Sequence, residues 1–517
     1  DRFSYEGLNG DDRLTSPMVK RDGAWHAVEW EEALILVAER LKAAGDDQIG
    51  CLVSPSATLE EMYLAQKLVR GLGSNHIDHR LRQRDFRADA ADPVLPWLGL
   101  PIAELEQQQA VLLVGSDIRQ EQPLLAHRVR KAALDGGAVA LINPYRVDLT
   151  HPSTQLVGAP DAMLADLGAV AKALGNDGLG GSQPGDAHQR IAEVLKAAGA
   201  DRKGIILIGA LAQSMPDYAA IKQAVYAIAD ASGARVGFLQ PGANGVGAHL
   251  AGAAPHVLPG AKPADKAGLA TADMLEAPRK AYLLWGLEPD LDLSNPSRAM
   301  AALGKADFVV AASSYLAPSL QAVADVLLPI GGFAETSGTL VNGEGAWQRF
   351  QGAVAPPGEA RPGWKVLRVL GNLLDLEGFG FSDTAGICAE LTAACDGVTP
   401  DNAPRTATKL DARPLGDGLI RIGNVPIYAI DPMVRRARSL QRSPSASPFG
   451  VYLNTAQSQA LGVGDGDEVE VGCDGISVRA KVSLDENVPE GCVCIPAGVA
   501  GSETLGDQFA AVSINKA

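Results

Sequence analysis

The sequence has few cysteines, few aromatic residues and no long apolar run. Six cysteines among 517 residues, none in a C-x-x-C pair, are too few for a disulfide framework and favour a reducing compartment. Aromatic residues make up 5% of the chain, which argues against a platform for stacking bases. No run approaches the ~18 apolar residues that span a bilayer, and no signal peptide is recognisable. We expect no direct membrane span, and the missing initiator Met suggests a fragment or a processed chain.

The charge balance is acidic. The chain has 45 Lys and Arg against 61 Asp and Glu, a net charge of -16, which argues against a broad basic face for nucleic acid. Hydrophobic residues at 46% and charged residues at 21% are ordinary values for a globular protein. At roughly 100–200 residues per domain, the length predicts about three or four domains.

Several nucleotide and hydrolase motifs are missing. The nearest candidate for a G-x-G-x-x-G dinucleotide loop is 245–250, where Leu250 replaces the third glycine. A glycine turn at a strand end is the favoured interpretation of Gly245 and Gly247, and phosphate contact is the alternative. No G-x-x-x-x-G-K-[ST] loop and no G-x-S-x-G elbow occurs, so neither P-loop hydrolysis nor an α/β-hydrolase is supported.

The cysteines do not form a metal-binding pattern. Cys388 and Cys395 are seven residues apart, whereas an iron–sulfur cluster usually draws four thiolates that include a close-spaced pair. Cys492 and Cys494 flank Val493, so on a strand they share one face. We expect both to be small apolar thiols in a barrel core, reduced and without a metal.

One short segment is strongly basic. His76 and His79 beside Asp78 suggest a metal site, but no third His or Cys is clustered there and four neighbouring cations would repel a divalent ion. Two interpretations of the cations stay open: a solvated loop with weak surface ion pairs, or a contact for an anion or a partner subunit. The four cations are Arg80, Arg82, Arg84 and Arg87.

Short apolar runs alternate with helical patterns through most of the chain. Near-continuous apolar runs are typical of strands buried on both faces, which predicts parallel sheets in α/β layers. There are too many such runs for one sheet, so we expect two α/β domains. The predicted strands are 49–53, 111–114, 139–142, 205–208, 235–239, 281–285, 308–311 and 326–328, with helices at 59–72, 124–134 and 217–231.

The C-terminal part changes to a β pattern. Residues 376–415 are punctuated by Gly and Pro, which predicts a linker. Residues 468–471 and 476–482 alternate polar and apolar, and Asp474-Gly475 between them is a strong hairpin signal. This spacing predicts a small β-barrel.

Several segments resemble the molybdopterin oxidoreductase superfamily. Residues 13–23 with 30–34 resemble its N-terminal segment, 335–348 resemble a second signature, and 460–469 resemble its C-terminal double-psi barrel. The resemblance implies two doubly wound α/β domains followed by a double-psi β-barrel. The expected parts are 1–45 as the remnant of an N-terminal domain, 46–105 with 200–375 as a discontinuous α/β domain, 106–199 as an inserted α/β domain, 376–415 as the linker and 416–517 as the barrel.

Other segments resemble the family of the large iron–sulfur subunit of respiratory complex I, which is the G-type or 75-kDa subunit. The resemblance implies a structural part in the peripheral arm of a proton-pumping NADH:quinone oxidoreductase. Its partners would be other peripheral-arm subunits, at the cytoplasmic face of the bacterial inner membrane. That family binds iron–sulfur clusters through cysteines upstream of this segment, and none of those cysteines is present here. The segments are 1–9, 75–80, 84–86, 356–364 and 431–436.

The superfamily also implies a test for a metal site. In members resembling formate dehydrogenase, a segment like 75–78 leads to the residue that ligates the metal, and that position falls at about Arg84. A guanidinium stays protonated and offers no lone pair to a metal. Asp85, its neighbour, could in principle supply an oxygen. Where the superfamily has a P-G-T-D motif in its phosphate region, this chain has G-A-P-D within 157–161.

We therefore expect a scaffold with no catalytic, cofactor-binding or metal-binding residue in this chain. Alone it would have neither NADH nor quinone activity, because no redox centre can be assigned to it. The enzymatic alternative is a molybdenum or tungsten bis-pterin oxidoreductase resembling formate dehydrogenase. A third class is a nucleotide-binding α/β module that uses the turn at Gly245 and Gly247.

Overall fold

The chain folds into two units, each assembled from separated segments. The computed structural model describes residues 3–179, 182–406, 410–413, 415–473 and 475–517. Unit 1 comprises Asp1–Leu81, Pro241–Thr399 and Tyr428–Ala446. Unit 2 comprises Arg82–Gln240, Pro400–Ile427 and Ser447–Ala517. The predicted α/β class with a C-terminal barrel is confirmed.

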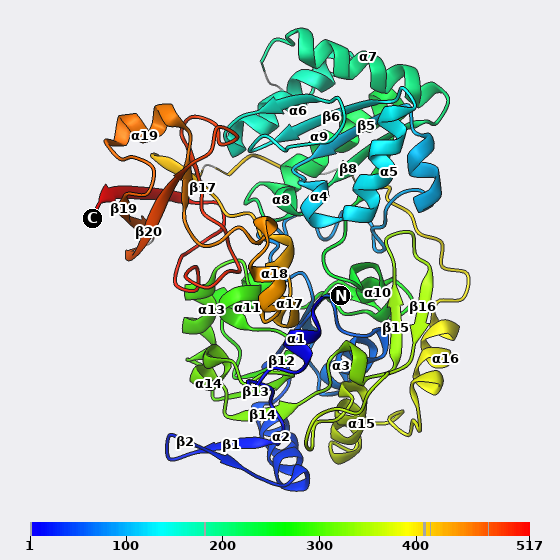
Figure 1. Ribbon diagram of the computed structural model, residues 1–517. Coiled ribbons are helices and arrows are strands. Elements are labelled where there is room, and N and C mark those ends of the chain that lie inside the picture. The colour runs from blue at the N-terminus through cyan, green and yellow to red at the C-terminus, as the bar shows by residue number, and fades with distance from the viewer. Residues whose placement is uncertain (1–2, 180–181, 407–409, 414, 474) are drawn as a thin grey trace. The chain divides into compact units, whose positions relative to one another are not determined.

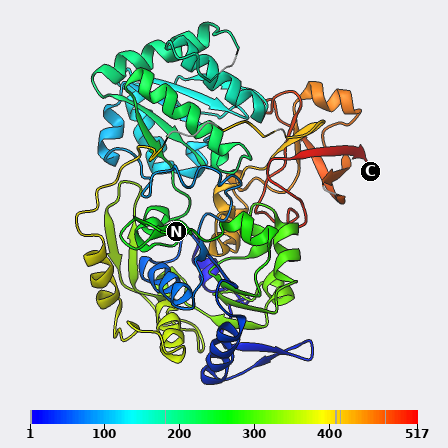
Figure 2. The same cartoon turned by 180° about the vertical axis from the view of Figure 1, so that it is seen from behind.

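A seven-stranded sheet forms the centre of unit 1, in the order β2-β1-β14-β13-β12-β3-β4. Strands β4, β3, β12, β13 and β14 are parallel, and every residue of these five is buried, as their apolar sequences predict. The hairpin β1–β2 adds antiparallel to β14 and projects from the sheet (Figures 1 and 2). The strands are β1 (Met18–Arg21), β2 (Ala24–Ala27), β3 (Ile49–Val53), β4 (His76–Asp78), β12 (Ala281–Trp285), β13 (Phe308–Ser313) and β14 (Val326–Pro329).

Helix α3 (Leu59–Gly71) follows β3, and ten of its thirteen residues are buried. It begins after Thr58 because Thr58 and Glu61 form a capping box. It packs against α10, α15 and α16. The other helices of unit 1 are α1 (Tyr5–Leu8), α2 (Trp30–Ala44), α10 (Gly245–Ala251), α11 (Thr271–Glu276), α12 (Pro289–Asp292), α13 (Pro296–Leu303), α14 (Pro318–Val323), η2 (Phe333–Glu335), α15 (Gly363–Leu373), α16 (Thr384–Ala394), α17 (Pro432–Arg435), α18 (Arg438–Gln441) and η4 (Pro444–Ala446).

A buried ion cluster ties the last segment of unit 1 to the rest of the unit. Arg435 on α17 lies between two carboxylates, 2.9 Å from Glu288 and 2.8 Å from Asp292. Burial alone would lower the pKa of Arg435, but these carboxylates outweigh it and raise the pKa above its usual value. Arg436 extends the cluster to Glu288 at 2.7 Å and also pairs with Asp12.

Two short hairpins complete unit 1. One consists of β15 (Gly338–Val341) and β16 (Trp347–Phe350), the other of β10 (Val257–Leu258) and β11 (Lys262–Pro263). The expected linker 376–415 is not irregular throughout, since α16 forms within it and contacts α3. Asp383 starts α16 by accepting a hydrogen bond from the backbone N–H of Gly386 at 2.9 Å.

A five-stranded parallel sheet forms the centre of unit 2, in the order β7-β6-β5-β8-β9. Alternate residues face two cores: Leu112 and Ile206 face α6, α7 and α9, while Leu113 and Leu207 face α5 and η1. The elements are η1 (Ile102–Gln107), β5 (Ala110–Val114), α4 (Ile118–Glu121), α5 (Pro123–Leu134), β6 (Ala138–Asn143), β7 (Thr154–Val157), α6 (Pro160–Ala173), α7 (Asp186–Ala200), β8 (Gly204–Ile208), α8 (Ala210–Gln213), α9 (Tyr218–Ser232) and β9 (Arg235–Phe238).

The strands of this sheet lie on both sides of residue 199, where the inserted α/β domain is expected to end. Strands β8 and β9, expected in the discontinuous α/β domain with 200–375, lie beside β5 on the second sheet. Residues 82–105, expected in that same domain, also belong to unit 2. The boundary could not be predicted because a strand belongs to this sheet only if it pairs with its neighbours around Ala110–Val114. The strands of both sheets are similarly apolar, so their sequences do not show which strands pair.

The C-terminal strands close into a barrel in the order β17-β21-β18-β20-β19-β22. Val451, Val469, Val482 and Val493 are among the residues that fill its interior. Asp474 of the predicted hairpin lies outside the described residues, and β19 and β20 pair antiparallel with Cys473 opposite Ile476. The elements are β17 (Leu419–Ile422), η3 (Ile427–Ala429), β18 (Val451–Leu453), α19 (Thr455–Leu461), β19 (Glu468–Cys473), β20 (Ile476–Leu484), β21 (Cys492–Cys494) and β22 (Ala511–Lys516).

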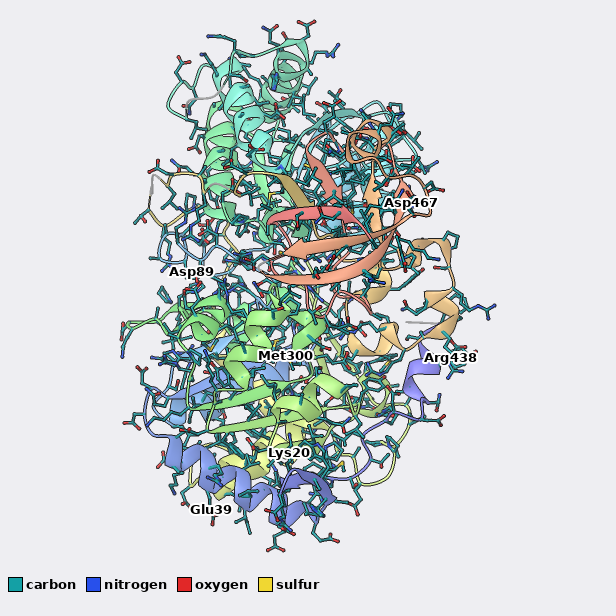
Figure 3. The ribbon with its side chains drawn as sticks, turned by 90° about the vertical axis from the view of Figure 1, so that its left-hand side faces the viewer. Lys20, Glu39, Asp89, Met300, Arg438 and Asp467 are labelled. Atoms are coloured by element: carbon teal, nitrogen blue, oxygen red, sulfur yellow. The ribbon has the colours of Figure 1, made fainter. Side chains whose placement is uncertain are left out.

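The barrel rim carries ordinary surface charges. Asp467, labelled in Figure 3, precedes β19 and pairs with Lys516 of β22 at 3.1 Å. Both side chains are more than a third exposed, so the pair contributes little to stability. Within the described ranges, no helix in either unit is long and apolar enough to cross a bilayer.

Candidate functional site

The basic segment lies largely inside the protein and is held by carboxylates of the same chain. Arg80 donates from Nε and Nη2 to the two oxygens of Asp78, at 2.9 and 3.0 Å. Arg87 makes the same paired contact with Asp85, at 2.8 Å for both bonds. Both carboxylates are fully buried. Each arginine therefore neutralises an internal carboxylate two residues before it, in the fork geometry that Arg favours.

Asp85 has both of its oxygens engaged. Oδ1 accepts from the backbone N–H and Nε of Arg87, and Oδ2 accepts from Nη2 of Arg87 and from the backbone N–H of Ala219 at 3.0 Å. Burial would raise the pKa of Asp85, but these bonds outweigh it and hold the pKa below its usual value. A metal could use this carboxylate only after displacing Arg87.

Arg84, at the position where the family resemblance puts the metal ligand, pairs with Asp507. Nη1 of Arg84 lies 2.5 Å from Oδ2 of Asp507, and the two side chains are 16% and 12% exposed. The loop that carries Asp507 is held by Arg421, which is buried and donates to the backbone carbonyls of Gly506 and Asp507 at 3.1 and 3.3 Å. Burial lowers the pKa of Arg421 to about 10.

These contacts change the interpretation of the basic segment. A solvated loop is wrong, because Arg80 is buried and Arg84 and Arg87 are mostly buried in paired contacts. Its use as a contact for a partner subunit stays untested. Neither Arg84 nor Asp85 fits a molybdenum ligand in this arrangement, since one has no lone pair and the other has its oxygens occupied.

The two histidines of the segment have separate neighbours. His76 lies 3.2 Å from the Asp47 carboxylate and accepts from the backbone N–H of Leu269. His79 lies 2.9 Å from the carbonyl of Ala253, and burial lowers its pKa to about 4. In the part of the chain that the structure describes, no group of three or more His, Cys, Asp or Glu side chains is gathered for a metal ion.

The glycine segment at 245–250 forms helix α10, not an open phosphate loop. All seven residues of α10 are buried. A Cβ on Gly247 would lie 2.0 Å from Oδ1 of Asn244, so a glycine is needed for close packing there. Asn244 itself accepts from the backbone N–H of Val341 at 2.8 Å and joins α10 to hairpin β15–β16. The burial of Gly245 and the close approach at Gly247 support a packing role for both glycines.

Cys492 and Cys494 lie on the outer wall of the barrel, which corrects the expected barrel-core position. Val493 points into the barrel, whereas Cys492 joins the core between the barrel and the five-stranded sheet, with Cys494 packed against that core. The strand period predicted a shared face and could not tell the inner face from the outer one. Burial raises the pKa of both thiols to about 12. Neither forms a disulfide, and Cys388 and Cys395 are also unpaired with another cysteine.

The second superfamily signature is fixed by internal contacts in unit 1. Glu335 accepts from Arg13 and from the backbone N–H of Gly332, the latter at 2.7 Å. Thr339 donates from its backbone N–H and its hydroxyl to Glu60, both at 2.8 Å. Burial raises the pKa of Glu60. These signature residues therefore join the N-terminal segment, α3 and β15.

The usual nucleotide position of unit 1 also carries a buried carboxylate. In a doubly wound sheet, ligands bind beyond the carboxyl ends of strands where the chain order reverses, here between β3 and β12. Glu61 lies at the start of α3 in this crevice and accepts from the backbone N–H of Thr58 at 2.9 Å. A Cβ on Gly363 would lie 1.9 Å from its carboxylate and 2.9 Å from the Trp285 ring. The backbone N–H groups of Thr58 and Glu61 at the start of α3 are thus bound by side chains of the same capping box.

Comparisons with known proteins find the same relatives that the sequence motifs resemble. Residues 13–373 match the family described as Molybdopterin oxidoreductase. The chain is similar to the G-type subunit of NADH-quinone oxidoreductase from Streptomyces coelicolor, with 30% identity over 98% of this chain and 63% of that protein. It is also similar to the F420-dependent formate dehydrogenase subunit alpha of Methanocaldococcus jannaschii, with 23% identity over 96% of this chain and 88% of the relative.

One solved structure supports the fold. Acetylene hydratase from Pelobacter acetylenicus superposes with a TM-score of 0.65 at 15% identity, covering 99% of this chain and 93% of the enzyme. The chain spans only 63% of the length of the Streptomyces relative, so the activity of that whole protein is not carried over here. From the match over residues 13–373, the chain belongs to the molybdopterin oxidoreductase family.

Proposed function

We propose that the chain is the molybdopterin-type part of the large iron–sulfur subunit and serves as a scaffold in an NADH-quinone oxidoreductase. Electron transfer from NADH to quinone would belong to the whole complex, with iron–sulfur clusters bound outside these residues. The chain would lie peripherally at the cytoplasmic face of the membrane and dock to other peripheral-arm subunits. Similarity to two G-type subunits, of Streptomyces coelicolor and Rhizobium meliloti, over 98% and 96% of this chain supports the assignment.

The observation that carries the scaffold role is the ion pair of Arg84 with Asp507. In family members resembling formate dehydrogenase, the residue at this position would ligate the metal, and a ligand must offer a lone pair. Arg84 supplies a permanent positive charge and is neutralised by Asp507 at 2.5 Å. The neighbouring Asp85 is bound by Arg87. This local charge balance is complete without a metal.

The test is elemental analysis of the purified chain together with an activity assay. We expect no stoichiometric molybdenum, tungsten or iron, and no NADH or quinone turnover by the chain alone. About one molybdenum atom per chain, with pterin fluorescence after denaturation, would overturn the scaffold proposal. Co-purification with other peripheral-arm subunits tests the docking part separately.

A molybdenum or tungsten bis-pterin oxidoreductase is the second candidate. The observation that favours it is the formate dehydrogenase relative of Methanocaldococcus jannaschii, of which this chain covers 88%. Under that function, Arg84 and Asp507 would have to separate to admit a metal. The purified chain would then contain molybdenum or tungsten and would reduce an electron-accepting dye when formate is added. Absence of both measured signals in chain purified from molybdate-supplied cells would exclude the candidate.

A further inference from the structure

The five-stranded sheet of unit 2 has one place where a ligand would be expected. The chain runs from β5 outward through β6 and β7, then returns to the other side of β5 with β8 and β9. The loops after β5 and β8 therefore diverge at a reversal of strand order, and α/β sheets bind anionic ligands in this crevice. The two loops begin at Gly115 and Gly209.

The side chain of Glu121 bridges these two loops. Its Oε2 accepts from the hydroxyl of Ser116 at 3.0 Å and from the backbone N–H of Ala210 at 3.1 Å. Its Oε1 accepts from the backbone N–H of Asp117 at 3.0 Å. Three donors from both sides of the crevice thus converge on one carboxylate, the arrangement that would hold an oxygen-rich anion such as a phosphate.

The loops approach each other too closely to leave room for a second anion. A Cβ on Gly209 would lie 2.3 Å from Cβ of Ser116, and a Cβ on Gly115 would lie 2.5 Å from Cβ of Ala212. Asn143 fixes the first loop by donating to the carbonyl of Ser116 at 2.7 Å and accepting from its N–H at 2.9 Å. The two loops can come this close because Gly115 and Gly209 have no side chain, and the crevice between them is therefore narrow.

A second carboxylate adds negative charge at the same place. Asp117 follows Ser116 in the first loop, and Oδ2 of Asp117 accepts from the hydroxyl of Tyr145 at 3.3 Å. A phosphate entering the crevice would have to displace Glu121 and would then meet Asp117. Both carboxylates repel such an anion in a site of low dielectric.

We propose that Glu121 is an internal anion that fills the phosphate position of this sheet and keeps nucleotide ligands out of unit 2. This inference rests on the scaffold proposed above, because a scaffold needs no ligand in this sheet. The ligand class that the position would otherwise take is a carboxylate or a phosphate. The chain supplies that group itself and thereby joins the loops after β5 and β8.

The experiment is an anion rescue of the full-length chain. Glu121→Ala leaves the three donors without their acceptor, so its melting temperature should fall. At pH 8, above the pKa of about 7 at which Glu121 of the wild type ionises, about 0.2 M sodium acetate, compared with sodium chloride of equal ionic strength, should then raise the Tm of Glu121→Ala by about 2 °C or more through binding to the folded state. The wild-type chain and Asp135→Ala, which removes an exposed carboxylate after α5, should show no acetate-specific rise.

Two further measurements complete the test. Glu121→Gln keeps the side-chain size but offers one acceptor oxygen where the carboxylate offers two. Hydrogen exchange should therefore quicken in peptides covering 115–118 or 209–212 of this variant, which decides the question if Glu121→Ala does not fold. Titration with GDP should leave the wild-type Tm unchanged.

The outcomes separate this inference from the scaffold proposal. An equal acetate response in wild type and Glu121→Ala, no response in a folded Glu121→Ala, or unchanged exchange in Glu121→Gln would overturn the internal-anion role. GDP stabilisation of the wild-type chain would overturn it as well. Molybdenum content is measured independently, so a metal-free chain that fails the rescue refutes only the role of Glu121.

Discussion

Nη1 of Arg84 lies 2.5 Å from Oδ2 of Asp507, joining the segment after residue 82 to a loop of the C-terminal barrel within one unit. The contact joins residues that are 423 positions apart in the sequence. Arg421 supports it from the barrel side by binding the carbonyl of Asp507. Arg84, at the position that the family resemblance assigns to a metal ligand, therefore forms an ion pair that Arg421 helps to hold in place.

Separating this pair should destabilise the chain. Because both side chains are mostly buried, Arg84→Ala removes the guanidinium that lies 2.5 Å from Asp507, and we expect a loss of about 2–4 kcal/mol in the free energy of unfolding. Asp507→Asn should cost a similar amount, and the double variant should cost less than the sum. Urea unfolding of all four chains gives the coupling energy, and simple additivity would contradict the pairing.

Charge reversal at Arg87 should impair folding before it affects docking. Arg87→Glu places a second carboxylate beside Asp85, which is fully buried, and we expect a loss of about 3–5 kcal/mol. Arg190→Glu on α7 is the matched control, because that residue is exposed and its reversal should change stability by less than about 0.5 kcal/mol. Equal urea midpoints for the two variants would mean that Arg87 is a surface residue after all.

Glu121 should make stability depend on pH. Burial raises the pKa of Glu121 to about 7 from its usual 4.5, although bonds from Ala210 and Ser116 oppose the shift. Between these values the folded state holds a proton that the unfolded state has released, so stability falls as pH rises from about 4.5 through 7. The decrease is at most about 3 kcal/mol.

Glu121→Gln removes this titration. Its free energy of unfolding should therefore vary less between pH 5 and pH 8 than that of the wild type, as measured by urea unfolding at each pH. Asp135→Asn, an exposed carboxylate in the same unit, serves as the control and should keep the wild-type profile. A wild-type slope retained in Glu121→Gln would show that Asp117 or another group carries the dependence.

Cys492 should be inert toward thiol reagents in the native chain. Its side chain is buried, and burial raises its pKa to about 12, so almost no thiolate is present at pH 8. We expect labelling by an uncharged maleimide only after denaturant is added, with mass spectrometry locating the label. Fast labelling of Cys492, with Cys492→Ser as the blank, would place β21 away from the sheet core.

The sequence predicts the strands better than it predicts their partners. The apolar run 281–285 indicates a buried strand wherever it pairs, and the structure has β12 there. Nothing in 205–208 says that β8 pairs with β5 rather than with a strand of the other sheet, because Ile and Leu suit either neighbour. Residues 384–394 lack a clear apolar period, so the sequence alone predicts no helix where the structure has α16.

The candidate site shows the same limit at the level of single residues. The spacing Asp78-x-Arg80 recurs as Asp85-x-Arg87, a local signal from which both ion pairs could have been inferred. No local signal identifies Asp507 as the partner of Arg84, since the contact depends on how the barrel joins the sheet. Cys492 illustrates the intermediate case, in which alternation gives a shared face but not its direction.

The position of Arg435 has a consequence for how the chain is made. Glu288 and Asp292 leave the ribosome long before Arg435, and until it arrives they remain two acidic groups with no cation from α17 between them. Unit 2 likewise lacks its closed barrel until β22 (Ala511–Lys516) has been synthesised. Neither unit can complete its native contacts during most of translation, so folding should depend on slow closure of long loops. Nascent chains released before 435 should then be favoured substrates for chaperones and proteases.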